Sequence, residues 1–259
     1  MIKDIFTDQG DSLYSARVLE FMEEYKKNGN VLGAYINGKF WKHFIKPIET
    51  IVVLGCNRHA YSEFLIEFYD PQIIYAFDPD PTVANDIRNN RKQDFVHLKD
   101  KVIYNKIAVS DVDGTVDFYE SKEVERFNGS LYKRFKPPKL ITGIDSPSGA
   151  EIQKEKIKVN CTRLDTFFSD QPNIKIDLLC VDIQGAELYA LKGLGDLIKN
   201  TSYIILEIPK DESCNYHENG YSVDDIYSFL ETNGFSVCEK EQENDFEDNV
   251  LFARRPIKV

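Results

Sequence analysis

The sequence lacks a long hydrophobic run. In this chain of 259 residues, uninterrupted apolar stretches such as residues 51–54 fall far short of the ~20 residues that cross a bilayer as a helix. We therefore expect no membrane span. The N-terminal residues MIKDIFTD place two aspartates where a secretion signal needs an apolar core, so we also expect no cleaved leader and a cytoplasmic location.

Cysteine and positive charge are also scarce. The five cysteines are widely spaced, and no two of them form a CxxC pair, which predicts reduced thiols rather than a disulfide framework. The 32 lysines and arginines are outnumbered by 43 aspartates and glutamates, which gives a net charge of −11. The field of such a chain repels polyanions, so nucleic acid is not an expected partner.

What the chain does contain is apolar material for one sizeable core, in a pattern that changes near residue 48. Residues 1–48 are predicted to be an N-terminal helical appendage, which can close over the site as a lid, because residues 12–27 carry a broad apolar stripe. Residues 49–259 are predicted to be one domain. Within it, a polar insert at about residues 120–156 separates two half-exposed strands at residues 115–119 and 157–162, and we interpret the insert as a second part of the lid.

The rest of this domain alternates strands with helices, which predicts an α/β fold with a mostly parallel sheet and helices on both faces. The last two apolar runs flank a polar connection, which indicates a terminal antiparallel hairpin. The expected strands are residues 51–56, 73–77, 101–109, 176–181, 203–208, 235–238 and 250–253, and the expected helices are residues 61–69, 81–92, 186–194 and 223–233.

Two residues at the ends of the first two strands suggest a nucleoside site. Gly55 follows the first strand, where backbone amides can meet an anion, although a single glycine also suits an ordinary turn. Asp78 ends the second strand, about 20 residues later, where a carboxylate can accept the hydroxyl protons of a ribose. The alternative is that Asp78 only caps the following helix.

Two further acids end later strands. Asp182 follows the strand at residues 176–181, and Glu207 holds the corresponding place in the next strand. Over one cleft, the two carboxylates can orient a nucleophile, neutralise a cationic cofactor or share a metal ion. A pair of capping or salt-bridged acids is the alternative.

Three segments together resemble the FkbM-type methyltransferase family. They are YAFDPDP at residues 75–81, VDIQGAE at residues 181–187 and IILEIP at residues 204–209, and the resemblance covers residues 50–254. It implies a Rossmann-like class I methyltransferase with a seven-stranded sheet and S-adenosylmethionine as the cofactor. The chain departs from the family pattern in the first turn, with Val53 in place of an aspartate and His59 in place of a second glycine.

The resemblance also assigns residues to the two ligands. The cofactor residues it implies are Gly55, Asn57, Asp78, Ile107 and Asp182. For the acceptor, it implies Ser130 and Glu187. Asn128 and Tyr132 are expected contacts for another reason: aromatic and hydrogen-bonding groups suit a sugar, although these residues could also simply pack the insert onto the sheet.

Methyl transfer to a hydroxyl requires removal of one proton. The candidate bases, in order, are Asp182, Glu207 and His217, although a lone histidine in this loop also suits the surface. Asp182 and Glu207 could hold magnesium, which prefers oxygen ligands, but two acids do not establish a metal site.

The sequence therefore predicts an S-adenosylmethionine-dependent O-methyltransferase acting on a hydroxyl of a sugar, a glycan or a related small molecule. One alternative is a catalytically silent cofactor-binding or regulatory relative, because Val53 and His59 change the cofactor turn. Another is a nucleotide-dependent oxidoreductase, which the lack of GxGxxG glycines disfavours. The sequence does not predict the acceptor identity or the oligomeric state.

Overall fold

The computed structural model of the chain describes residues 40, 43–56, 65–66, 69–81, 83, 101–121, 129–134, 153–215, 217–242 and 246–254. Most of the predicted N-terminal appendage lies outside these residues, and so do Asn57, His59 and Asn128. The division at residue 48 accordingly stays a prediction. The structure describes no helix that is both long and apolar enough to traverse a bilayer.

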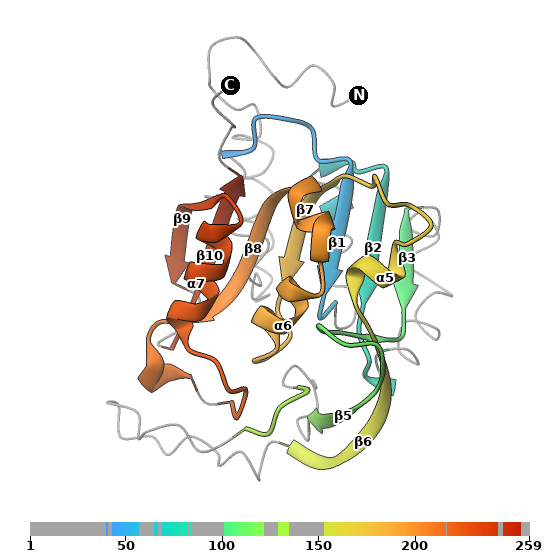
Figure 1. Ribbon diagram of the computed structural model, residues 1–259, viewed down its shortest axis with the longest axis vertical. Coiled ribbons are helices and arrows are strands. Elements are labelled where there is room, and N and C mark those ends of the chain that lie inside the picture. Colours follow the sequence, from blue (N-terminus) through green and yellow to red (C-terminus); the bar gives the residue numbers. More distant parts are fainter. Residues whose placement is uncertain are drawn as a thin grey trace, which may run out of the picture.

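A seven-stranded sheet in the order β3-β2-β1-β7-β8-β10-β9 forms the centre of the molecule (Figure 1). Its strands β1, β2, β3, β7 and β8 pair in parallel, whereas β10 runs antiparallel to both β8 and β9. The predicted sheet and its terminal antiparallel hairpin are therefore confirmed. The strand bounds are Thr50–Leu54 (β1), Ile73–Phe77 (β2), Val102–Asn105 (β3), Ile176–Val181 (β7), Thr201–Pro209 (β8), Phe235–Gln242 (β9) and Glu247–Arg254 (β10).

The parallel strands are apolar on both faces because both faces are covered. Along β1, Val52 and Leu54 point into one hydrophobic core, and Ile51 and Val53 point into another. Helices α5 (Leu164–Phe167), α6 (Glu187–Lys192) and α7 (Val223–Thr232) pack against the first face, in front of the sheet in Figure 1. The opposite face is covered by side chains that include Phe40, Phe44, Leu65 and Tyr69.

The local sequence sets where α7 begins and ends. Ser222 and Asp225 form a reciprocal capping box at its start, which satisfies backbone amides that have no partner within the helix. Gly234, with a φ of +83°, follows the last turn and reverses the chain into β9. Two short 3-10 helices, η3 (Gly195–Asn200) and η4 (Glu212–Cys214), precede β8 and follow it, respectively.

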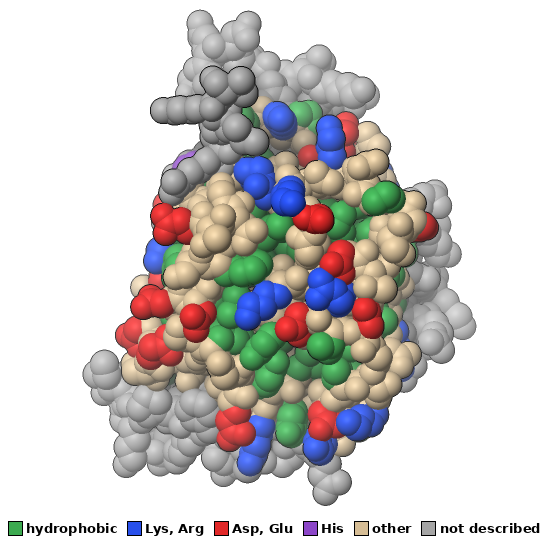
Figure 2. All heavy atoms as spheres, in the orientation of Figure 1, with side chains coloured by type: hydrophobic (Ala, Val, Ile, Leu, Met, Phe, Trp, Pro, Cys, Tyr) green, Lys and Arg blue, Asp and Glu red, His purple; other side chains and the backbone are tan. Residues whose placement is uncertain are grey.

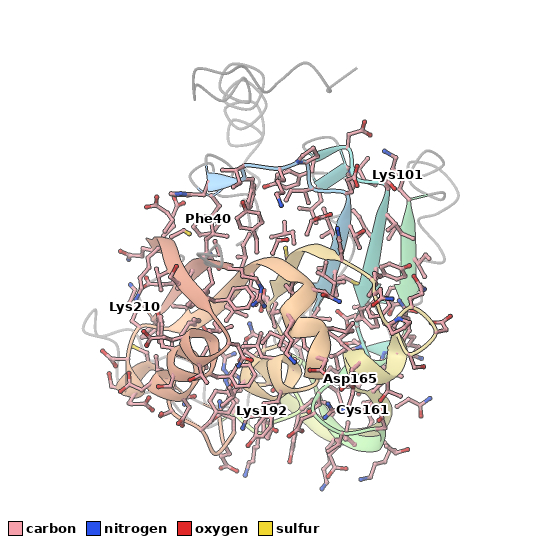
Figure 3. The ribbon with its side chains drawn as sticks, turned by 45° about the horizontal axis from the view of Figure 1, so that its top comes forward. Phe40, Lys101, Cys161, Asp165, Lys192 and Lys210 are labelled. Atoms are coloured by element: carbon pink, nitrogen blue, oxygen red, sulfur yellow. The ribbon has the colours of Figure 1, made fainter. Side chains whose placement is uncertain are left out.

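A second, three-stranded sheet has the order β4-β6-β5, with bounds Ala108–Val109 (β4), Gly114–Ser121 (β5) and Gln153–Thr162 (β6). It lies beyond the carboxyl ends of the parallel strands, at the bottom of Figure 1. Cys161 of β6 and Phe40 accordingly lie at opposite ends of the molecule (Figure 3).

The expected single strand at residues 101–109 is wrong. The chain turns after Asn105, whose carbonyl accepts hydrogen bonds from the amides of Ile107 and Asp78. Ala108 and Val109 then pair with β6 instead of continuing the large sheet. The break places Ile107 beside the end of β2.

Candidate functional site

The turn after β1 is built around Gly55. Its φ is +80°, and a β-carbon on Gly55 would lie 1.8 Å from the backbone oxygen of Asp182. The amides of Gly55 and Cys56 both donate hydrogen bonds to the carbonyl of Phe77, at 2.9 and 3.2 Å. These two amides therefore join β1 to β2, and the missing side chain lets β1 meet β7.

Asp78 lies buried at the end of β2. Its Oδ1 accepts a hydrogen bond from the amide of Asp80 at 3.0 Å, so one carboxylate oxygen stabilises the turn, as the capping alternative predicts. The Tyr104 hydroxyl donates to the Asp78 carbonyl at 2.9 Å. Burial raises the pKa of the adjacent Cys56 thiol, and the charge of Asp78 raises that pKa further. The structure thus brings Asp78 next to the Gly55 turn.

Asp182 and Glu207, from the ends of β7 and β8, are joined by the side chain of Gln184. The Gln184 Nε2 donates to Asp182 Oδ1 at 2.8 Å and to Glu207 Oε2 at 2.9 Å. Asp182 also donates its amide to the carbonyl of Leu54 on β1. The carboxylate pair therefore begins beside the Gly55 turn and extends toward β8.

Burial governs the charge of this pair. It raises the pKa of the Asp182 carboxyl, and the hydrogen bond from Gln184 opposes that rise. Burial also raises the pKa of the Glu207 carboxyl well above its usual range, and the charges of Asp182 and Glu247 raise it further. A carboxylate whose proton affinity is increased in this way is a stronger base than an exposed one.

Glu187 supports the turn between β7 and α6. Its Oε1 accepts hydrogen bonds from the amides of Ile183 at 3.3 Å and Gly185 at 3.0 Å, and its Oε2 accepts one from the Tyr221 hydroxyl at 2.9 Å. Burial raises the pKa of the Glu187 carboxyl to about 7, against these hydrogen bonds. Both oxygens of Glu187 are thus bonded to the chain itself, and its expected contact with the acceptor stays a prediction.

His217 lies buried over the same turn. A β-carbon on Gly185 would lie 2.5 Å from the His217 Cγ, so the imidazole packs directly on the glycine. Burial, together with the charge of Arg134, lowers the pKa of His217 to about 3. The surface alternative for His217 is wrong, since the side chain is buried.

Residues 129–134, within the insert, reach this site. Ser130 Oγ donates to the Gln184 carbonyl at 2.5 Å and accepts a hydrogen bond from the Tyr132 amide at 2.9 Å. The Tyr132 ring stacks on Tyr189 with 5.6 Å between centroids. A bridge between Arg134 and His217 fastens the insert to the loop after β8.

These elements line a pocket beside the carboxylate pair. Glu207 lines it, whereas Asp182 does not. Its lining residues are Gln184, Gly185, Glu187, Glu207, Pro209, Asn215, His217, Asn219, Tyr221, Val223, Ile226 and Glu247. Within the described chain, His, Cys, Asp and Glu side chains form no group of three that could hold a metal ion, so the magnesium hypothesis gains no support here.

Sequence reasoning missed Tyr221 and Glu247, and it did not foresee the bridging amide of Gln184. Tyr221 meets Glu187 only because the loop after β8 folds back over α6, and Glu247 arrives on an antiparallel strand. Gln184 had a weak signal in the sequence, because a glycine follows it at a strand end. Its own φ of +53° appears only in the structure.

Comparison with known proteins shows the family of this chain. The model of the methyltransferase FkbM domain matches residues 55–237, which is more than half of the chain. The chain is 25% identical over 203 residues to the 2-O-methyltransferase NoeI of Sinorhizobium fredii, with 76% of this chain and 77% of that protein covered. It is 26% identical over 151 residues to Methyltransferase 1 of Beauveria bassiana, with 56% of this chain and 58% of that protein covered.

Among solved structures, the methyltransferase FkbM of Methylobacillus flagellatus is similar with a TM-score of 0.49 and 11% identity, over 97% of this chain and 56% of that chain. The family match includes the Gly55 turn, Asp78 and the carboxylate pair. We conclude that this chain belongs to the FkbM methyltransferase family and is an S-adenosylmethionine-dependent methyltransferase.

Proposed function

We propose that the chain transfers a methyl group to a hydroxyl oxygen of a sugar, a glycan or a related small molecule. The observation that carries this proposal is the partly buried pair of Asp182 and Glu207, bridged by Gln184, with Glu207 on the wall of the pocket. A hydroxyl must lose a proton on methylation, and a carboxylate of raised pKa suits that task. The name of the related 2-O-methyltransferase NoeI supports oxygen as the methylated atom.

The residues at the ends of β1, β2 and β3 suit the adenosine part of S-adenosylmethionine. We assign Asp78 to the ribose hydroxyls, because it is a buried carboxylate at the carboxyl end of β2, beside the Gly55 turn. Ile107, partly buried and apolar, is assigned to the adenine. When bound, the cofactor supplies a methyl group activated by the sulfonium charge.

Glu207 is the first candidate to accept the proton of the acceptor hydroxyl, ahead of Asp182 and His217. Of the two bridged carboxylates it is the one that lines the pocket, and Asp182 lies between it and the Gly55 turn. His217 is the weakest candidate, because an imidazole with a pKa near 3 has little affinity for a proton at neutral pH. We infer that His217 instead covers Gly185 and shapes the pocket.

Polar and aromatic groups of the pocket suit a hydroxylated acceptor. Asn215 and Asn219 offer amides at the pocket wall, and the stacked rings of Tyr132 and Tyr189 lie next to it, where a sugar ring can pack. Ser130 is already bonded to Gln184 and Tyr132, so we assign it to docking the insert rather than to direct acceptor contact.

We infer that the acceptor is a small molecule or glycan rather than nucleic acid, and that the chain works in the cytoplasm. On the described face in Figure 2, acidic side chains gather at the left edge, over α7 and β9, and basic ones lie among acidic and apolar neighbours. Such a surface gives a polyanion little to bind. All five cysteines lie in the described chain, and each is a thiol rather than half of a disulfide, which suits a reducing compartment.

Methyl transfer from labelled S-adenosylmethionine tests the proposal directly. The purified chain is incubated with a panel of monosaccharides and oligosaccharides, and in parallel with nucleosides and tRNA, and the products are identified by mass spectrometry. We expect methyl ethers on the sugars. Transfer to RNA alone would overturn the acceptor class.

Calorimetric titration separates the remaining alternatives. Binding of S-adenosylhomocysteine without turnover on any acceptor would favour the silent relative. Binding of NAD in place of the sulfur ligands would favour the oxidoreductase.

A further inference from the structure

The side-chain amide of Gln184 spans two acids that come from different strands. Its Nε2 carries two hydrogens, and the structure directs it to both carboxylates: Asp182 at 2.8 Å and Glu207 at 2.9 Å. One neutral group therefore satisfies an oxygen of each acid. If this donor were removed, each acid would lose one hydrogen bond, and their relative orientation would be less strongly fixed.

The backbone of Gln184 is held in an unfavourable conformation to achieve this. Its φ of +53° lies in the left-handed region, which costs a side-chain-bearing residue energy. Bonds on both sides secure it, since Ser130 Oγ donates to its carbonyl and Glu187 Oε1 accepts from the flanking amides of Ile183 and Gly185. Strain that is secured from several directions at a pocket wall points to a function for the side chain so placed.

Further titratable and charged side chains surround the pair of Asp182 and Glu207. Glu247 on β10 and Glu187 on α6 both act on Glu207 and raise its affinity for a proton. Among the other pocket residues, Tyr221 is bonded to Glu187, and His217 lies buried with Arg134 beside it. The pair thus sits among further acids. A side-chain hydrogen bond joins Asp182 and Glu207 directly, and the amide of Gln184 is a neutral donor to both of them.

We propose that Gln184 is a positioning residue, which clamps Asp182 and Glu207 in one geometry so that Glu207 meets the acceptor hydroxyl in a fixed orientation. This inference rests on the proposed function for the role of Glu207. Gln184 acts through the two acids and takes no proton itself. Its loss therefore affects the chemical step more than the binding of either ligand.

Two substitutions of Gln184 distinguish the role of its side-chain amide from that of its backbone conformation. Q184M keeps the length and the backbone preference but removes the donor, and Q184N tolerates the left-handed backbone but is one methylene too short to reach both acids. We expect each variant to lower kcat roughly 10- to 100-fold, with KM for the acceptor and Kd for S-adenosylhomocysteine within about 2-fold of wild type. The control is Q171M, the same change at an exposed position. Wild-type kcat in Q184N would overturn the inference, because position 184 would then matter only for its left-handed backbone conformation.

A second measurement needs no turnover. The free energy of unfolding in urea is determined at neutral pH for wild type, Q184M, E207M and the double variant. We expect the two substitutions to be non-additive, since each removes the same hydrogen bond. Additive effects together with normal methyl transfer would overturn the clamp and leave the proposed function standing. A non-additive cycle in a chain inactive on every acceptor would retain the clamp as a structural contact but overturn its catalytic role along with the proposed function.

Discussion

Gly55 lies so close to Asp182 that a β-carbon on the glycine would come within 1.8 Å of the aspartate's backbone oxygen. The neighbouring atom is backbone, between two paired strands, and cannot move aside without separating β1 from β7. The Gly55 turn therefore packs directly on the backbone of Asp182, one member of the carboxylate pair. The resemblance assigns Gly55 to the cofactor, and the structure adds this packing role.

Replacing Gly55 with alanine should strongly destabilise the chain. The matched control is Gly234→Ala, because Gly234 has nearly the same φ, +83°, and its added β-carbon would meet only an ordinary contact at 3.6 Å from Arg254. We expect the control to cost about 1–2 kcal/mol from backbone strain and Gly55→Ala to cost at least about 2 kcal/mol more. Urea denaturation measures both, and equal losses would show that the collision is relieved.

Replacing Asp78 with asparagine should weaken binding of S-adenosylhomocysteine by on the order of 1–3 kcal/mol, because a ribose hydroxyl loses its charged acceptor. Asparagine keeps an oxygen for the Asp80 amide, so the turn is retained. Asp177→Asn is the control, since Asp177 also accepts backbone amides, those of Glu49 and Thr50, but at the opposite end of the sheet. Unchanged affinity in calorimetric titration of Asp78→Asn would refute the ribose assignment.

Replacing Glu207 with glutamine should lower kcat by about 10²- to 10⁴-fold, the usual contribution of a general base, while the affinity for the cofactor stays near wild type. Asp182→Asn should show a smaller loss of kcat, because Asp182 does not line the pocket. Glu218→Gln makes the same change in charge at an exposed position of the neighbouring loop and serves as the control. Should Glu207→Gln lose cofactor affinity and kcat equally, Glu207 would be structural.

The burial of Glu187 should appear as a pH dependence of stability. Its pKa is raised from 4.5 to about 7, so the folded chain retains a proton that the unfolded chain releases between these values. Stability therefore falls as pH rises from about 4.5 to 7, by roughly 3 kcal/mol for this group. Below pH 4.5 both states are protonated, and the penalty vanishes.

Glu187→Gln is nearly isosteric and can keep the bonds to Gly185 and Tyr221 without a titrating proton. Relative to wild type, its free energy of unfolding should improve as pH rises through this window and level off above about pH 7. Urea denaturation from pH 4 to 8 measures the difference. Parallel curves for the two proteins would show that Glu187 does not titrate in this range.

Hydrophobic periodicity in the sequence was sufficient to determine the large sheet. Runs such as residues 51–54 and 178–181 are apolar at every position, which is typical of a strand covered on both faces. The acids that follow these runs had to lie at the carboxyl edge, because parallel strands all end there. The sequence-based prediction failed at residues 101–109, where two apolar runs on either side of Asn105 and Lys106 suggest one strand. In the structure β3 ends at Asn105, whose carbonyl accepts a hydrogen bond from the amide of Asp78.

The residue types and strand ends that form the site, including Asp78, Asp182 and Glu207, were thus determined by the sequence alone. Only the tertiary structure decided how they are used: that Gly55 leaves room for Asp182, that Gln184 bridges two acids, and that Glu207 rather than Asp182 lines the pocket. The physical reason is distance along the chain. Periodicity and local preference act over a few residues, whereas contacts between strand ends and loops depend on how the whole sheet and its covering layers pack together.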